Sequence, residues 1–210
     1  MKKILSAVVV AAALTFAGTA QAQFALDLKM AYAIPTGNVI NGIALSNSTS
    51  GAIPFEVAGR YRFTPNLSAG LYFQWGPAFL KSSFCDVGLS CSASDMRLGV
   101  EVMYGFNPTG MNPWVSLGTG WEWSFASATA GGLSATSQTN GWEYFNIQTG
   151  IDFPLSKLFG LGPYVGYFGG SFTSWSATDS NGVYTSGTYG SGVAAFHGWF
   201  QIGAKGTFNF

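Results

Sequence analysis

Charge is scarce in this chain. Only 9% of its 210 residues are Asp, Glu, Lys or Arg, whereas soluble domains carry about 25% charged residues. A surface that charge keeps soluble is therefore not expected, and the formal net charge of zero argues against a nucleic-acid partner. Aromatic residues, in contrast, make up 16% of the chain, which argues against a disordered protein. The length predicts a single domain.

Long hydrophobic runs are missing after the first 22 residues. No later segment therefore predicts a membrane-spanning helix, which needs about 20 apolar residues. The start of the chain has two lysines, an apolar run over residues 4–17 and a small-x-small sequence at 20–22. This pattern is typical of a cleaved signal peptide, and the run is too short for the alternative, a membrane anchor. We interpret residues 1–22 as the signal peptide and 23–210 as the mature domain.

Cysteine and histidine are also rare, which limits metal and redox sites. Secretion would expose the two cysteines, Cys85 and Cys91, to an oxidising compartment, so we expect a disulfide between them. A metal site would need further ligands, and no histidine lies nearby, because the chain has only His197. We expect neither a metal nor another cofactor.

The mature chain is dominated by alternation with a period of two. In residues 24–34, for example, the apolar Leu26 and Leu28 flank the charged Asp27, as in a strand with one apolar and one polar face. The alternation predicts eight strands, at residues 24–34, 53–63, 67–75, 96–106, 113–125, 142–153, 161–172 and 196–210. Segment 161–172 leaves its two faces undecided, because glycines and aromatics fall on both. A membrane-spanning strand needs about 9–11 residues.

The connections between these segments alternate in length. The long connections are 35–52, 76–95, 126–141 and 173–193, and the short ones are 64–66, 107–112 and 154–160. Long and short connections therefore fall on opposite ends of the sheet. Short turns at one end and long loops at the other are typical of outer-membrane barrels.

The charged side chains decide which face of the sheet points outward. Ten of them fall on the minor face of the expected strands: Asp27, Lys29, Glu56, Arg60, Arg62, Arg97, Glu101, Glu122, Asp152 and Lys205. A basic residue facing lipid costs about 2–4 kcal/mol, so ten charges in lipid would exceed a typical folding stability of about 5–15 kcal/mol. We therefore place them in the lumen and the apolar face in lipid. The predicted fold is all-β: an eight-stranded antiparallel transmembrane up-and-down barrel, preceded by a cleaved signal peptide.

A narrow lumen gives these charges a structural role. An eight-stranded barrel is only just wide enough for its own side chains, and buried charges need partners. We expect five acids and five bases to pair and plug the lumen; an ion or proton path is the alternative. Aromatics near the expected strand ends fit interfacial belts or simple lipid contact: Phe24, Trp75, Trp121, Trp123, Phe125 and Phe153.

The C-terminal segment carries the most specific pattern. Residues 200–210 end in Phe210, with apolar residues such as Phe208 and Ile202 at alternate positions before it, although Gly206 fits less well. With the run GPYVGY at 162–167, the chain resembles the small outer-membrane β-barrel families of the OmpA transmembrane-domain, OmpX and OmpW kind. The resemblance implies a Gram-negative outer membrane, contact with its lipids, and recognition of Phe208 and Phe210 by the barrel assembly machinery.

Three functions remain as hypotheses. The first is a monomeric, plugged barrel with periplasmic termini that displays four surface loops to an unidentified partner. The second, implied by the OmpW resemblance, is passive passage of small and even apolar solutes. The third is a lipid-modifying enzyme that uses His197 with Ser171 or Ser191; no motif surrounds His197, so we expect a protein that is not an enzyme.

Overall fold

The computed structural model describes residues 23–83, 85, 88–190 and 192–210. The expected signal peptide lies outside these residues. The elements are β1 (Phe24–Ile40), β2 (Ile43–Ala44), α2 (Leu45–Ser48), β3 (Thr49–Ala52), β4 (Phe55–Arg62), β5 (Leu67–Leu80), β6 (Ser90–Gly105), β7 (Asn112–Ala130), β8 (Leu133–Pro154), β9 (Phe159–Thr178), β10 (Tyr184–Thr188) and β11 (His197–Asn209). Within the described residues, no helix is both long enough and apolar enough to cross a membrane.

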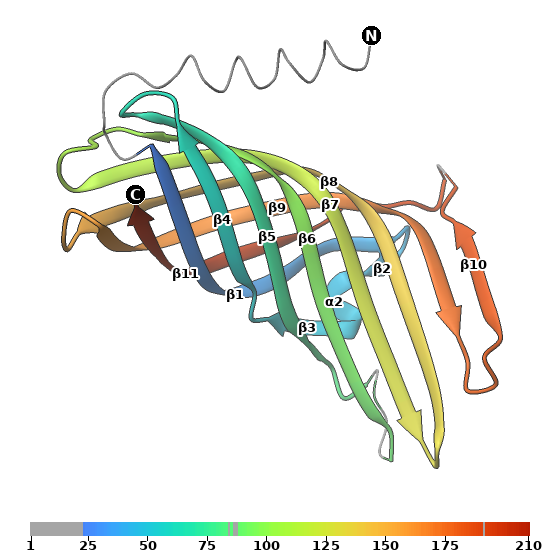
Figure 1. The fold of residues 1–210 in the computed structure, drawn as a ribbon. Coiled ribbons are helices and arrows are strands. Elements are labelled where there is room, and N and C mark those ends of the chain that lie inside the picture. Colours follow the sequence, from blue (N-terminus) through green and yellow to red (C-terminus); the bar gives the residue numbers. More distant parts are fainter. Residues whose placement is uncertain (1–22, 84, 86–87, 191) are drawn as a thin grey trace, which may run out of the picture.

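Eight of the strands form a closed antiparallel ring (Figure 1). The order is β1, β4, β5, β6, β7, β8, β9 and β11, and β11 pairs again with β1. Closure removes the unpaired edges that a sheet of this length would otherwise expose. The predicted eight-stranded up-and-down barrel is confirmed.

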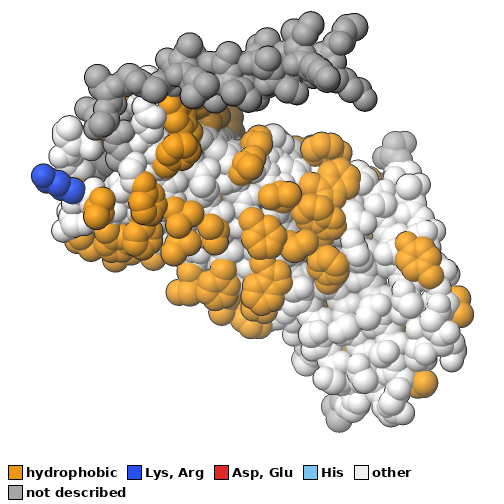
Figure 2. Space-filling view, in the orientation of Figure 1, with side chains coloured by type: hydrophobic (Ala, Val, Ile, Leu, Met, Phe, Trp, Pro, Cys, Tyr) orange, Lys and Arg blue, Asp and Glu red, His pale blue; other side chains and the backbone are white. Residues whose placement is uncertain are grey.

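Side-chain exposure follows the predicted two faces. On β1, Asp27 and Lys29 are 0% and 3% exposed, whereas Leu28 between them is 43% exposed. On β9, the undecided segment places Tyr164 and Phe168 inside and Leu161 outside. Figure 2 shows hydrophobic side chains gathered over the barrel strands. An apolar exterior around a charged interior suits hydrocarbon and not water.

The strands are longer than the sequence predicted. β7, β8 and β9 have 19, 22 and 20 residues, about twice what a membrane crossing needs. The expected loop 126–141 is mostly strand: β7 and β8 pair until the turn at Gly131 and Gly132, both with positive φ. Apolar alternation stops where a strand leaves the hydrocarbon, but Ser, Thr and Ala continue the backbone pairing. The loop boundaries taken from apolar alternation were therefore wrong.

The paired extensions of β6 to β10 form a projecting sheet at one end of the barrel (Figure 1). We call this sheet the blade; it comprises residues 90–94, 124–140, 174–178 and 184–188. The start of β1 and the C-terminus lie at the opposite end, together with the short turns. We call that end the turn end.

The first long connection folds into the barrel instead of forming a free loop. Within it, β1 continues to Ile40, and α2 and β3 follow. Leu45 of α2 is 8% exposed and belongs to a buried cluster with Phe168 and Trp199, whose side chains point inward. This connection therefore covers the lumen at the blade end.

Candidate functional site in the barrel interior

Polar and charged side chains fill the lumen in three layers along the barrel axis. The layer at the turn end is built around Asp27. The Arg60 guanidinium contacts the Asp27 carboxylate at 2.5 Å, and Thr207 Oγ1 donates a 2.8 Å hydrogen bond to the other carboxylate oxygen. Lys205 Nζ lies 2.8 Å from Asp152 and 3.9 Å from the centroid of a buried indole ring. Every charge in this layer has an opposite charge in contact with it.

The middle layer is built around Lys29. Its Nζ atom lies 2.6 Å from Glu56 and 3.5 Å from Glu101, and it donates a 2.9 Å hydrogen bond to Gln148. Gln74 Nε2 in turn donates to Glu56 over 3.0 Å. The layer therefore joins five strands, β1, β4, β5, β6 and β8, across the lumen.

The layer nearest the blade is built around Arg97. Its guanidinium contacts Asp95 at 2.5 Å, Glu122 at 2.6 Å and Glu143 at 3.3 Å. The imidazole Nε2 of His197 lies 2.8 Å from Glu122. One cation thus holds together acidic side chains from three strands, β6, β7 and β8.

Nine of the ten charges predicted for the lumen take part in these layers. The exception is Arg62, which donates to Asn209 at the rim of the turn end. The predicted charge balance is not found, because the three layers hold seven carboxylates against four Lys and Arg side chains. These are Asp27, Glu56, Asp95, Glu101, Glu122, Glu143 and Asp152, against Lys29, Arg60, Arg97 and Lys205.

Sequence reasoning missed two of these carboxylates, Asp95 and Glu143. Asp95 was placed in a loop but belongs to β6. Glu143 shares its parity with Phe145, so strict alternation predicted it outside, but a β-bulge between these two residues turns it inward. Tyr72 Oη and Asn146 Nδ2 each donate a 2.6 Å hydrogen bond to it. The sequence does contain a sign of this bulge. The outward aromatics Trp142 and Tyr144 stand at even positions, whereas from Phe145 onward the outward side chains stand at odd positions.

The geometry around His197 does not form a catalytic triad among the described residues. The His197 side chain is fully buried and stacks on Phe172, and its Nδ1 atom has no described hydrogen-bond partner. Ser171 Oγ donates instead to the carbonyl of Ala195. Ser191 lies outside the described residues. Nor do the described residues include a group of three or more His, Cys, Asp or Glu side chains suited to a metal ion.

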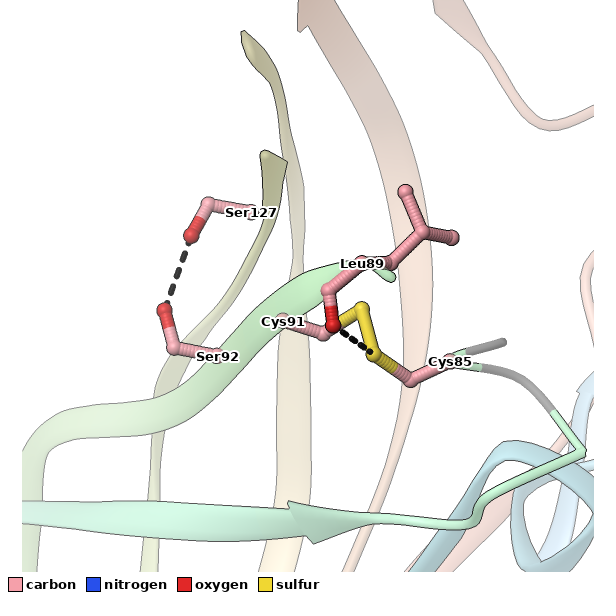
Figure 3. The surroundings of a disulfide bond; sticks show 5 residues. All are labelled: Cys85, Leu89, Cys91, Ser92 and Ser127. Atoms are coloured by element: carbon pink, nitrogen blue, oxygen red, sulfur yellow. Dashed lines mark hydrogen bonds between the residues drawn. A yellow bond between two sulfur atoms is a disulfide. The ribbon is translucent and has the colours of Figure 1, made fainter. Parts of the chain in front are cut away.

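The predicted disulfide between Cys85 and Cys91 is confirmed (Figure 3). Both cysteines were expected in a loop, but Cys91 belongs to β6. The bond therefore ties the preceding connection to the start of a blade strand.

The C-terminal phenylalanines lie at the seam of the barrel. Phe208 packs against Phe159 with ring centroids 4.9 Å apart, and the Phe210 amide donates to the carbonyl of Phe24 over 2.8 Å. Phe210 is 67% exposed. Their recognition by the assembly machinery stays a prediction.

No family model matches this chain, and no curated protein matches it. Several solved structures do share its fold. The outer membrane protein OprG from Pseudomonas aeruginosa aligns over 92% of this chain and 99% of its own, with 13% identity and a TM-score of 0.54. Neisserial surface protein A aligns over 89% and 97%, with 14% identity and a TM-score of 0.52. A major outer membrane protein from Thermus thermophilus aligns over 87% and 99%, with 13% identity and a TM-score of 0.51.

At these identities the likeness concerns the fold. It agrees with the closed ring of eight strands and with the apolar exterior, which were established from the chain itself. By fold, therefore, the chain is an eight-stranded β-barrel of the outer-membrane type.

Proposed function

We propose that this protein is a closed barrel that anchors the blade in the outer membrane and displays it to the exterior. The observation that carries the proposal is the filled lumen. Side chains from opposite walls meet in all three layers, and the largest of them, including Arg97, Tyr72, Trp114 and Gln148, are at most 2% exposed. Packing of this kind supports a lumen that is closed to water and ions.

The two ends of the lumen differ in how they are covered. A hollow of about 580 Å³ opens at the turn end, where Arg60, Arg62 and Asp152 contribute to its wall. At the blade end, Leu45 covers the aromatic side chains of Phe168 and Trp199. The three charged layers lie between these two ends.

The direction of display follows from the lengths of the connections. Outer-membrane barrels have short periplasmic turns and long extracellular loops. The short turns, the start of β1 and the end of β11 lie together at the turn end, so we assign that end to the periplasm and the blade to the cell exterior. A closed ring needs no neighbour to pair its strands, which favours a monomer.

Planar-bilayer recording with the purified protein tests the closed lumen. We expect no steady conductance steps from the wild-type protein. The matched control is the double variant W114A/Y164A, which removes two inward rings whose centroids lie 6.4 Å apart. Loss of these rings leaves space in the packed lumen, so this variant should produce conductance steps. Steady, reproducible steps from the wild-type protein would overturn the proposal in favour of passive solute passage.

A further inference from the structure

A second hollow lies on the outer side of the sheet, where the blade strands leave the apolar belt. Its volume is about 530 Å³, within the roughly 300–1,000 Å³ that is usual for small-molecule sites. Two rows of paired residues cross its floor, and Trp75 lies at its edge. One row is Pro77, Ser94, Phe125, Gln138 and Ser176, and the other is Ser92, Ser127, Thr136, Thr178 and Tyr184.

Strand register shows which way these rows face. Paired residues point to the same side of a sheet, and successive residues point to opposite sides. Asp95, the neighbour of Ser94, points into the lumen, where it contacts Arg97. Ser94 and the residues paired with it therefore point away from the lumen, and so do Ser92 and its row.

The chemistry of the hollow is uniform. None of the side chains that line it carries a charge. Hydroxyl and amide groups share the floor with three alanines, Ala93, Ala126 and Ala177. Ser92 Oγ and Ser127 Oγ lie 2.8 Å apart in a hydrogen bond between neighbouring strands (Figure 3). Aromatic rings stand among them, with Trp75, Phe125 and Tyr184 all contributing to the wall.

These features select one class of ligand. A charged ligand would find no opposite charge here. A wholly apolar ligand would displace water from the floor hydroxyls outside the Ser92–Ser127 pair without replacing its hydrogen bonds. A ligand that fits must present hydroxyl groups to the floor and apolar C–H faces to the rings. Sugar rings have both kinds of surface.

An aromatic belt at the membrane interface explains only part of this arrangement. It accounts for Trp75 and Phe125, which lie at the edge of the apolar exterior. A belt that only contacts lipid, however, requires neither a hollow nor Ser and Thr side chains in both rows. The hollow is also held in place, because its floor is paired on several strands and the disulfide at Cys91 fixes the residue next to Ser92. A preformed site loses less entropy when a ligand binds.

We propose that this hollow binds an uncharged oligosaccharide. The inference rests on the proposed display of the blade at the cell exterior, where such a ligand would be met. Binding can nevertheless be measured on purified protein, so its outcome is independent of conductance and of membrane orientation.

Saturation-transfer NMR tests the proposal on the mature protein, folded in a detergent without a sugar headgroup, since a glycoside detergent would compete. The neutral probes are maltotriose, cellotriose and chitotriose, and the charged probe is a sulfated heparin oligosaccharide. We expect saturable binding of at least one neutral probe and weaker binding of the sulfated one. No saturable binding of any neutral probe, or tighter binding of the sulfated one, would overturn the proposal.

Variants then locate the binding. Trp75→Ala and Tyr184→Ala should each weaken binding by about tenfold, the equivalent of one lost ring contact. Trp142→Ala is the matched control, because Trp142 is a similarly exposed outward indole that does not line the hollow. Ser94→Phe should block binding by filling the hollow without removing a ring, which keeps the test decisive if Trp75→Ala misfolds. Equal binding by the hollow variants and the control would contradict the assigned site.

Discussion

Arg97 is the side chain on which the lumen layer nearest the blade depends. It contacts three carboxylates, those of Asp95, Glu122 and Glu143. Phe168 packs over the guanidinium at 5.3 Å, and Gln74 accepts a 2.6 Å hydrogen bond from it. Because this layer holds more acids than bases, loss of the one guanidinium leaves several buried negative charges side by side.

Arg97→Met should therefore destabilise the barrel by about 3–5 kcal/mol, the usual cost of leaving a buried charge without its partner. Glu143→Gln removes one negative charge from the same layer, keeps the size of the side chain and can still accept hydrogen bonds from Tyr72 and Asn146. Its effect should stay within about 1 kcal/mol. Urea unfolding in lipid vesicles measures both. Equal destabilisation by the two variants would contradict this account of the layer.

Residue-level prediction from the sequence depended on period-two alternation and failed where alternation breaks. Nine predicted charges lie in the three layers because each keeps the parity of its strand. Glu143 was missed because one extra residue in β8 reverses the parity beyond it. Alternation predicts the face of a residue only within a stretch that has no bulge. A bulge shows in the sequence only through the residues beside it, which here are the two adjacent outward aromatics Tyr144 and Phe145.

At the scale of elements, strand existence was predictable and strand length was not. The apolar period reports the part of a strand that faces hydrocarbon, so it found all eight barrel strands. It gives no information about the blade, where β7 and β8 continue with Ser, Thr and Ala. The burial of Leu45 against Phe168 and Trp199 was likewise hidden, because it depends on contacts between residues far apart in sequence.

The disulfide should act on the blade and not on the barrel. It closes a ring between residues six positions apart, for which chain entropy gives about 2–2.5 kcal/mol. In the double variant C85S/C91S, amides at residues 90–94 should exchange hydrogen faster, while those at residues 96–105, within the barrel part of β6, keep their protection. Hydrogen-exchange mass spectrometry of the two proteins makes the comparison. Unchanged exchange at residues 90–94 would show that strand pairing alone holds the blade edge.

At the scale of the whole molecule, the polarity of the inner and outer faces of the sheet determines which surroundings suit the barrel. The charged side chains point inward and the apolar side chains point outward, so the exterior suits lipid. Because the ring is closed, every strand in it pairs with a neighbour on both sides. Both properties follow from composition and alternation, which is why the fold was predictable with no family model to match. Orientation across the membrane depends instead on the asymmetry between short turns and the blade.

That asymmetry predicts which end of the barrel a reagent outside the cell can reach. Ser134 is exposed on the blade and Lys157 is exposed in a short turn, so Ser134→Cys and Lys157→Cys place one thiol at each end, while the native disulfide does not react. A maleimide too large to pass the outer membrane should label Ser134→Cys on intact cells. It should label Lys157→Cys only after the outer membrane is permeabilised, because the short turns would face the periplasm. The reverse pattern would show that the blade faces the periplasm. An oligosaccharide outside the cell could then not reach the hollow.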